Sequence, residues 1–194
     1  MDHYLDLMLR PDPEIAANVL LGALYSKLHR ALAYLQRDDI GVSFPSVDNA
    51  RNGLGTTLRI HGTTHAVHAL QATAWLNTMR DHVANSDLQA VPESCRYRGV
   101  RRVQAKSNPE RLRRRLMKRH GIDAAAAAER IPDTARETLD LPFIRLASAS
   151  TGQPFLIFID HGPLQDKATH GRFNSYGLGQ GATIPWFRPF FSDR

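Results

Sequence analysis

The sequence predicts an α+β protein built from two regions. Over residues 1–95, stretches of alternating apolar residues are interspersed with stretches of helical apolar spacing. Over residues 96–194, a short arginine-rich helix stands among further strand-like stretches. We therefore expect an N-terminal α+β domain over residues 1–95, followed by a C-terminal α/β lobe over residues 96–194.

The size and composition of the chain suit a globular protein with an apolar core. It has 194 residues, of which 42% are hydrophobic. No apolar run approaches the ~20 residues of a membrane helix, and the N-terminus shows no signal-peptide pattern. We therefore expect a cytoplasmic protein without membrane contact. Its single cysteine, Cys95, excludes an internal disulfide and a cysteine-based zinc site.

The first two elements follow from their apolar spacing. Residues 2–9 alternate in polarity, which predicts a strand. Residues 13–36 carry apolar side chains at helical spacing, interrupted internally only by Gly22, and predict a long helix that contains His29.

The next elements complete a recurring order. Segments 40–45 and 56–61 predict a hairpin, residues 65–83 a helix, and residues 88–92 a strand. The order strand, helix, strand, strand, helix, strand predicts a ferredoxin-like domain. This scaffold alone indicates little about function, although many RNA-recognition modules use it. The aromatic RNA-stacking motif of such modules is absent.

The C-terminal region combines helices with short strands. Asp123 can cap a helix over residues 124–130 that Pro132 ends, and residues 133–139 predict another helical turn or two. Strand patterns occur at 97–106, 143–147, 155–159 and 173–176.

Residues 108–120 predict the arginine-rich helix. Asn108 is a suitable N-cap, Pro109 suits the first helical position, Glu110 lies in the first turn, and Gly121 can close the end. Five cations fall three and four residues apart on one face: Arg111, Arg114, Arg115, Lys118 and Arg119.

The charge of this segment is one-sided. A solvated helix usually mixes both signs, but residues 96–120 contain eleven Lys or Arg and one acid, while the whole chain has a net charge of +6. Concentrated positive charge indicates a polyanionic partner, and we expect this helix to face a nucleic acid.

Two other patterns invite weaker interpretations. His61, His65 and His68 could suggest a metal site, but spacing fixes no third ligand, so we expect exposed histidines and no metal or other cofactor. The glycine-rich run 177–181 does not open a helix, so a nucleotide site is improbable; a turn close to an RNA backbone remains possible.

Several short runs, in order along nearly the whole chain, are shared with one family. They are residues 1–6 (Met-Asp-His-Tyr-Leu-Asp), 27–29 (Lys-Leu-His), 41–45 (Gly-Val-Ser-Phe-Pro), 102–116, 130–133 (Arg-Ile-Pro-Asp), 150–153 (Ser-Thr-Gly-Gln), 161–164 (His-Gly-Pro-Leu) and 176–178 (Tyr-Gly-Leu). The chain thereby resembles the subtype I-F CRISPR-associated endoribonucleases, which cut precursor CRISPR RNA.

The resemblance implies a site that spacing alone does not connect. It implies that His29 is catalytic and that Ser148 and Tyr176 position the ribose and the histidine. It also implies several RNA contacts. Arg102 and Gln104 match a base-reading pair, and Phe155 matches an aromatic that stacks on the terminal base pair. Arg115 matches an arginine near the scissile phosphate, and Ser150 and Thr151 are further implied contacts.

The implied partners are the CRISPR repeat hairpin and other subunits of a subtype I-F surveillance complex. The implied chemistry needs no metal, because the RNA 2′-hydroxyl attacks the adjacent phosphate; whether His29 is the base or the acid stays open. The alternative is a non-catalytic subunit that only binds a guide-RNA hairpin. A DNA-binding protein is a weaker alternative, because no helix-turn-helix or zinc-finger pattern is present.

Overall fold

The computed structural model describes residues 1–48, 53–104, 109–132, 139–148 and 151–188. The chain divides into two compact units. The first comprises residues 1–102 together with 141–194, and the second comprises residues 103–140. The predicted boundary between residues 95 and 96 lies inside the first unit. The division into domains 1–95 and 96–194 therefore stays a prediction.

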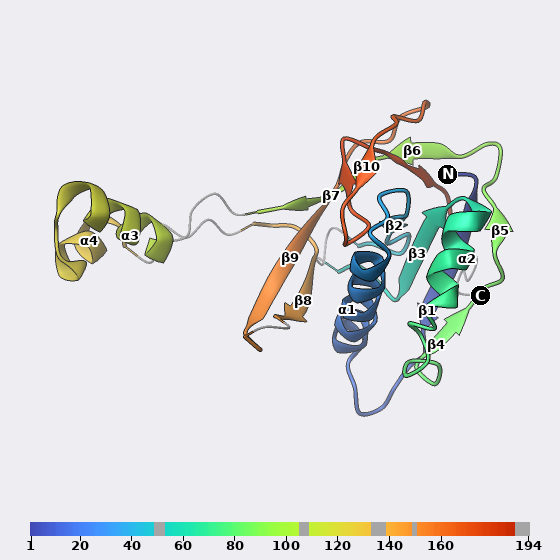
Figure 1. Ribbon diagram of the computed structural model, residues 1–194, viewed down its shortest axis with the longest axis horizontal. Helices are drawn as coiled ribbons and strands as arrows, with labels where there is room; N and C mark the ends of the chain where they lie inside the picture. The colour runs from blue at the N-terminus through green and yellow to red at the C-terminus, as the bar shows by residue number, and fades with distance from the viewer. Residues whose placement is uncertain (49–52, 105–108, 133–138, 149–150, 189–194) are drawn as a thin grey trace. The chain divides into compact units, whose positions relative to one another are not determined.

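The first unit contains an antiparallel sheet with strand order β2-β3-β1-β4, in which β5 also pairs with β1. Its elements, with the helices between them, are β1 (His3–Leu9), α1 (Ala17–Leu35), β2 (Gly41–Ser43), β3 (Thr57–Gly62), α2 (Thr64–Ala72), β4 (Val83–Asn85) and β5 (Gln89–Ala90). Helices α1 and α2 lie on the same side of this sheet (Figure 1). The predicted hairpin is confirmed as β2 and β3, and the α+β class is confirmed as well.

The core lies between these helices and the sheet. Alternation along β1 turns Leu5, Leu7 and Leu9 to the same face, and all three are buried. Leu24 and Leu28 of α1 belong to the same buried cluster. Helix α1 is therefore fixed by its apolar stripe, so the side chains that lie beside that stripe have defined positions.

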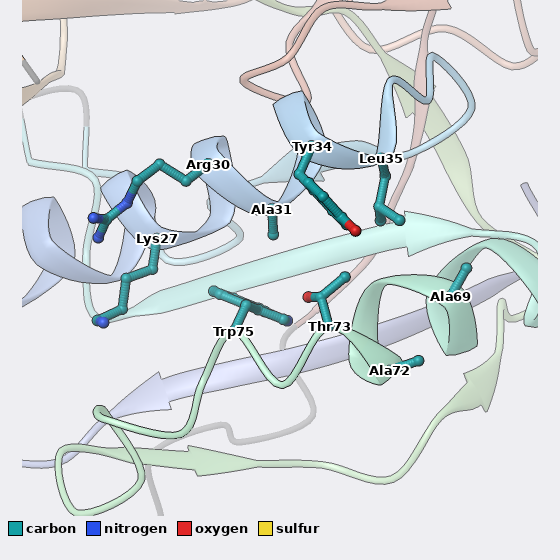
Figure 2. Close-up of a pocket in the computed structure, with 9 residues that line it drawn as sticks. All are labelled: Lys27, Arg30, Ala31, Tyr34, Leu35, Ala69, Ala72, Thr73 and Trp75. Atoms are coloured by element: carbon teal, nitrogen blue, oxygen red, sulfur yellow. The ribbon is translucent and has the colours of Figure 1, made fainter.

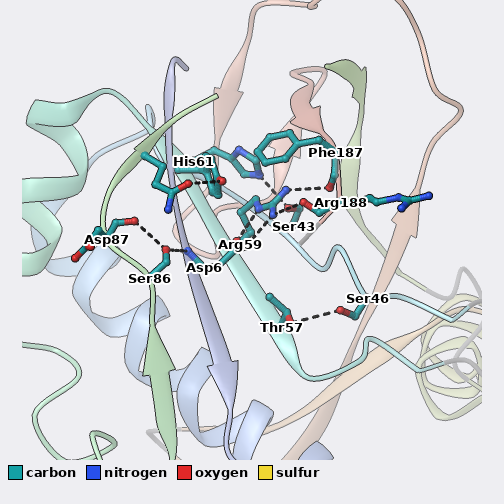
Figure 3. A network of polar contacts seen from close by, with 12 residues as sticks. Asp6, Ser43, Ser46, Thr57, Arg59, His61, Ser86, Asp87, Phe187 and Arg188 are labelled. Atoms are coloured by element: carbon teal, nitrogen blue, oxygen red, sulfur yellow. Dashed lines mark hydrogen bonds and ion pairs between the residues drawn. The ribbon is translucent and has the colours of Figure 1, made fainter. Parts of the chain in front are cut away.

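The other face of the sheet contains a buried ion pair (Figure 3). The Arg59 guanidinium donates to both carboxylate oxygens of Asp6 at 2.6 and 2.8 Å, and the two side chains are 1% and 0% exposed. Arg59 also donates to the carbonyl oxygens of Phe187 and Arg188, each at 3.0 Å. Because these bonds satisfy a buried cation, they hold the segment that follows β12 (Ile184–Trp186) against the sheet.

Both predicted helices of this region are too long. The first begins at Ala17 because the Asp12 carboxylate accepts from the backbone N–H groups of Glu14 and Ile15, which closes a turn before the helix. The second was predicted to reach residue 83 but ends at Ala72, since Ala74 has a left-handed φ of 54°. Trp75 and Met79, which follow it, pack on the core from turns, and β4 begins at Val83, the last residue of the predicted helix.

The C-terminal part of the first unit adds smaller sheets. Their strands, besides β12, are β6 (Arg96–Arg98), β7 (Val100–Val103), β8 (Phe143–Ala147), β9 (Pro154–His161), β10 (Arg172–Phe173) and β11 (Gly179–Gln180). They pair as β7-β9-β8, β12-β6 and β10-β11, and α1 packs against β8. The strand predicted over 97–106 is interrupted between β6 and β7, and the one predicted over 173–176 ends at Phe173.

The second unit is a pair of packed helices, α3 (Pro109–His120) and α4 (Ala124–Arg130). The predicted cap of α4 is confirmed, since the Asp123 carboxylate accepts from the Ala126 N–H at 2.8 Å. Gly121 follows α3 with a left-handed φ of 62°. The predicted cap Asn108 and most of the predicted turn at 133–139 lie outside the described residues. Within the described chain, no helix is both long and apolar enough to cross a membrane.

Candidate active site and nucleic-acid interface

A pocket of about 400 Å³ lies within the first unit, where α1 approaches the β8–β9 hairpin. Four residues singled out by sequence resemblance line it together: His29, Ser148, Phe155 and Tyr176. They come from three segments that are far apart in the chain. The remaining lining residues are Ser26, Arg30, Leu146 and Ala147.

The ring of His29 is held on two sides. Its Nδ1 lies 2.9 Å from the carbonyl oxygen of Ser175, and because a carbonyl can only accept, Nδ1 carries the proton. In the neutral ring, Nε2 is therefore the unprotonated nitrogen. The ring also stacks on Tyr176, with centroids 3.8 Å apart and planes 4° from parallel. This arrangement fixes both the tautomer and the orientation of the imidazole.

Both contacts of His29 come from one tight turn, which the side chain of Asn174 builds. The Asn174 amide oxygen accepts from the backbone N–H groups of Tyr176 at 2.8 Å and Leu178 at 3.2 Å. Gly177 completes the turn with a left-handed φ of 69°. These bonds explain why residues 174–176 form no strand, because the amide competes for the backbone donors.

Tyr25 ties this turn to α1, the helix that carries His29. The fully buried Tyr25 hydroxyl donates to the carbonyl oxygen of Tyr176 at 2.8 Å. Burial raises the pKa of Tyr25 well above its ordinary value, Tyr176 raises it further, and Arg102 opposes the shift. Tyr25 therefore stays a neutral donor at physiological pH, and the turn and the helix are held as one structure.

Ser148 stands at the first position of the loop between β8 and β9. Its N–H donates to the Gln153 carbonyl at 2.9 Å and its carbonyl accepts from Gly152 at 2.8 Å, which defines the loop. The strand that leads to Ser148 lies close to α1 because of Gly22. A Cβ at Gly22 would lie 2.6 Å from the Arg145 carbonyl oxygen, so a larger residue would push β8 away from the helix.

Other predicted RNA contacts lie at the pocket or on the surface. Phe155 is half-buried at the pocket, opposite Leu146 in the hairpin register. Thr151 is exposed in the same loop, and Ser150 lies outside the described residues. Arg102 is exposed on β7, and Gln104 is exposed just after that strand.

The cationic face of α3 is exposed as the helical spacing predicts. Arg111, Arg114, Arg115, Lys118 and Arg119 are all exposed, whereas Leu112 and Leu116 are half-buried. One further arginine, Arg113, is used structurally, since its Nε donates to the Ile131 carbonyl at 2.7 Å. The second unit therefore presents a cluster of charge suited to phosphates.

The three histidines considered for a metal have different surroundings. His65 and His68 are exposed as expected, but His61 is fully buried, so the expectation is wrong there. Its Nε2 lies 2.9 Å from the Ser43 hydroxyl, and burial, aided by Arg59, holds its pKa well below the usual value. No group of three or more metal-ligating side chains occurs among the described residues.

The sequence patterns did not reveal several residues that support the site. Arg30 and Ser26 line the pocket because α1 places them beside His29. Asn174 was missed because its segment matched a strand pattern. The run from Asn174 to Gly177 does carry a turn signal, an Asn with a Gly three residues later, which would have found it.

Comparisons with known proteins agree over nearly the whole chain. The profile of a family described as "CRISPR-associated protein (Cas_Csy4)" matches residues 4–187. A protein of Pseudomonas aeruginosa (strain UCBPP-PA14) named "CRISPR-associated endonuclease Cas6/Csy4" is 54% identical over 96% of this chain and 100% of its own. A protein of the same name from Escherichia coli (strain UTI89 / UPEC) is 44% identical over the same shares.

A solved structure described as "An RAMP protein binding different RNA substrates" covers 95% of this chain and 99% of its own. Its TM-score is 0.35 at 12% identity, so no argument rests on it.

Proposed function

The chain belongs to the CRISPR-associated Cas_Csy4 family and is an endoribonuclease, and we propose that it cuts precursor CRISPR RNA at the 3′ base of the repeat hairpin. The single observation that carries the proposal is the pocket itself. His29, Ser148, Phe155 and Tyr176 meet there from distant segments. Such a reaction needs a histidine, a hydroxyl, an aromatic ring for a base pair and a stacking partner for the imidazole.

The proposed reaction uses a nucleophile from the RNA. The ribose 2′-hydroxyl attacks the adjacent phosphate, so an O2′–P bond forms and the P–O5′ bond breaks. His29 Nε2 takes the 2′ proton, which its Nδ1 bond to Ser175 favours, and the leaving O5′ gains a proton from solvent. Ser148 holds the 2′-hydroxyl in line, and Tyr176 keeps the imidazole oriented. The products are a 2′,3′-cyclic phosphate and a 5′-hydroxyl; water can then open the cyclic phosphate at the P–O2′ bond to leave a 3′-phosphate.

Binding of the hairpin is assigned to other residues. The exposed cations of α3, Arg115 among them, supply affinity for phosphates. Arg102 and Gln104 read bases near the foot of the stem, Phe155 stacks on the terminal base pair, and Ser150 and Thr151 add contacts to the RNA. The protein then keeps the processed hairpin and joins the other subunits of a surveillance complex.

The proposed domain organisation follows the same division. The order β2-β3-β1-β4, with α1 and α2 as crossovers, supports a ferredoxin-like N-terminal domain over residues 1–95 that carries His29. Residues 96–194 form the lobe that binds the hairpin.

Cleavage of labelled RNA tests the function. Purified protein is incubated in EDTA with the repeat RNA of its own CRISPR array and with a hairpin of scrambled stem sequence. We expect one cut at the 3′ base of the repeat hairpin, a 5′-hydroxyl product, and no cut in the scrambled RNA. Tight binding without a cut would favour the non-catalytic hairpin-binding subunit, and loss of cleavage in EDTA would contradict the metal-independent reaction.

A further inference from the structure

The pocket around His29 contains one permanent cation among the residues that the structure describes. Of the eight described residues that line it, Arg30 alone is a lysine or arginine, and none is an aspartate or glutamate. His29 and Arg30 come from α1, whereas the wall from β8 and β9 is largely apolar, with Leu146, Ala147 and Phe155. A charge beside such a wall acts more strongly than it would in open water.

Helix α1 gives Arg30 a defined origin and leaves its guanidinium available. Leu24 and Leu28 anchor the helix in the core, whereas Arg30 is exposed. Within the described part of the chain, Arg30 has no ion pair and no side-chain hydrogen bond, in contrast to Arg37 just after α1, which pairs with Asp39. An arginine that is placed by a rigid helix and has no partner of its own can bind an anion without first breaking a contact.

Lys27, one turn earlier on α1, provides a contrast. It lines a separate groove of about 720 Å³ between α1 and α2, whose other wall carries Trp75, and it is not among the residues that line the His29 pocket. Arg30 lines both cavities. Figure 2 shows the Lys27 side chain extending toward the side of the groove that carries Trp75, whereas the Arg30 side chain runs back along the helix. Of these two cations, Arg30 is therefore the one placed to meet a group bound beside His29.

The proposed reaction builds negative charge beside His29. When the 2′-oxygen attacks, His29 Nε2 takes its proton and the electron pair of the oxygen forms the O2′–P bond. The two non-bridging oxygens then share a second negative charge, until the P–O5′ bond breaks and O5′ leaves with its electron pair and gains a proton from solvent. A positively charged donor beside these oxygens stabilises the transition state more than the ground state.

We propose that Arg30 is a further catalytic residue, whose guanidinium donates to a non-bridging oxygen of the scissile phosphate and offsets the charge that this oxygen gains in the transition state. This inference rests on the proposed function. It gives the first unit a cation of its own for the reaction, besides Arg115 of the second unit, which matches an arginine near the same phosphate in the family. The planar fork of an arginine can donate two parallel hydrogen bonds to phosphate oxygens, whereas a lysine acts as a point charge.

Single-turnover cleavage at saturating protein, in EDTA, tests the inference. Arg30→Gln removes the charge and should slow cleavage by about 10- to 100-fold, less than the ~10²–10³-fold lost with a preorganised oxyanion-hole donor, because Arg30 is exposed. Hairpin affinity should change little, since the contact strengthens in the transition state. Arg30→Lys keeps the charge without the fork and should recover part of the rate. Lys27→Gln, the matched control, removes a cation of the same helix from outside the pocket and should keep the wild-type rate.

A sulfur substitution identifies the atom that Arg30 contacts. Two further hairpins carry one phosphorothioate at the cut, each with sulfur in place of a different non-bridging oxygen. Sulfur is a weak hydrogen-bond acceptor, so the wild-type protein should cut one of the two more slowly than the all-oxygen hairpin. In Arg30→Gln that slowing should largely disappear, because the bond that sulfur weakens is already absent. A general loss of folding would instead lower the rates of all the hairpins by the same factor and leave the slowing in place.

The inference is overturned if Arg30→Gln cleaves at the wild-type rate or if Lys27→Gln is equally slow. It is also overturned if the slowing by sulfur is absent from the wild-type protein, is unchanged in Arg30→Gln, or disappears in Arg115→Gln alone, which would assign the contact to the second unit. A wild-type protein that does not cut the all-oxygen hairpin would instead refute the proposed function, and this inference with it.

Discussion

The pocket around His29, which we propose is catalytic, and the exposed face of α3, which we propose binds RNA, hold their side chains in opposite ways. In the pocket, His29 is fixed by the Ser175 carbonyl and by stacking on Tyr176. On α3, Arg114 and Lys118 are exposed and have no hydrogen bond or ion pair within the described residues. Chemistry requires a fixed geometry, whereas attraction to phosphates requires charge that can adapt to the RNA.

This contrast predicts that substitutions separate rate from affinity. Changes in the pocket should slow cleavage while leaving hairpin affinity nearly intact, and changes on α3 should do the reverse. A variant that changed the cleavage rate and the hairpin affinity by the same factor would show that the two regions do not have separate functions.

The largest expected effect is that of His29→Ala. If His29 accepts the proton of the ribose 2′-hydroxyl, the single-turnover rate of the variant should fall by about 10²- to 10⁴-fold. Its hairpin affinity should stay nearly unchanged. The control is His65→Ala, which removes an exposed histidine of α2. Should His29→Ala keep its rate, the proton would have to move through another group, and His120 and His161 would be the next to test.

A smaller loss is expected for Asn174→Ala, because Asn174 acts only through the turn that holds Ser175 and Tyr176. Without its amide oxygen, two backbone donors lose their acceptor and the His29 ring loses its fixed position. We expect the saturated single-turnover rate to fall by about 10- to 100-fold, since a misplacement near 1 Å can cost that much. The thermal midpoint serves as the control for folding.

Asn174→Asp separates positioning from a general loss of structure. Its carboxylate oxygen can still accept from the N–H groups of Tyr176 and Leu178, so it should recover most of the rate that Asn174→Ala loses. Equal rates for wild type and Asn174→Ala would mean that stacking on Tyr176 alone orients His29.

Loss of base reading should cost less and should depend on sequence. Arg102→Ala and Gln104→Ala should each reduce discrimination between the native hairpin and one with swapped closing pairs by ~1–3 kcal/mol. Both side chains are exposed, so folding should be preserved. Competition binding with the two hairpins measures the change, and an equal loss for both hairpins would make these residues phosphate contacts instead.

The smallest effects per residue are expected on α3. Arg114→Ala, Arg115→Ala and Arg119→Ala should each weaken hairpin binding and lower the slope of log affinity against log salt by ~1 for each phosphate that the helix no longer neutralises. Arg80→Ala, a change at an exposed cation of the first unit, provides the comparison. If all three slopes match that of the wild type, α3 does not face the RNA.

Local sequence patterns predicted the features that depend on neighbouring residues. The cap of α4 by Asp123 and the one-sided exposure of the α3 cations follow from spacing within a few residues. The meeting of His29 with Ser148 does not, because α1 packs on β8 across more than a hundred residues. Only the resemblance to a family connects these residues at the level of sequence.

The errors have a common physical cause. Residues after Ala72 kept helical apolar spacing because they pack on the core from turns, and the left-handed Ala74 left no trace in that spacing. The Asn174 side chain similarly replaced strand pairing with its own hydrogen bonds. In both places a single backbone or side-chain feature outweighed the periodic pattern.

The central claim, that the RNA itself supplies the nucleophile which His29 activates, is tested most directly by one substituted hairpin. A repeat hairpin with a 2′-deoxy sugar just upstream of the cut is compared with the all-ribose hairpin in EDTA, at saturating protein, with affinity and single-turnover cleavage measured for both. The account predicts that the deoxy hairpin binds as tightly as the native RNA and is not cut, because no other group takes the place of the 2′-oxygen. Cleavage of the deoxy hairpin at the same phosphate would contradict the account.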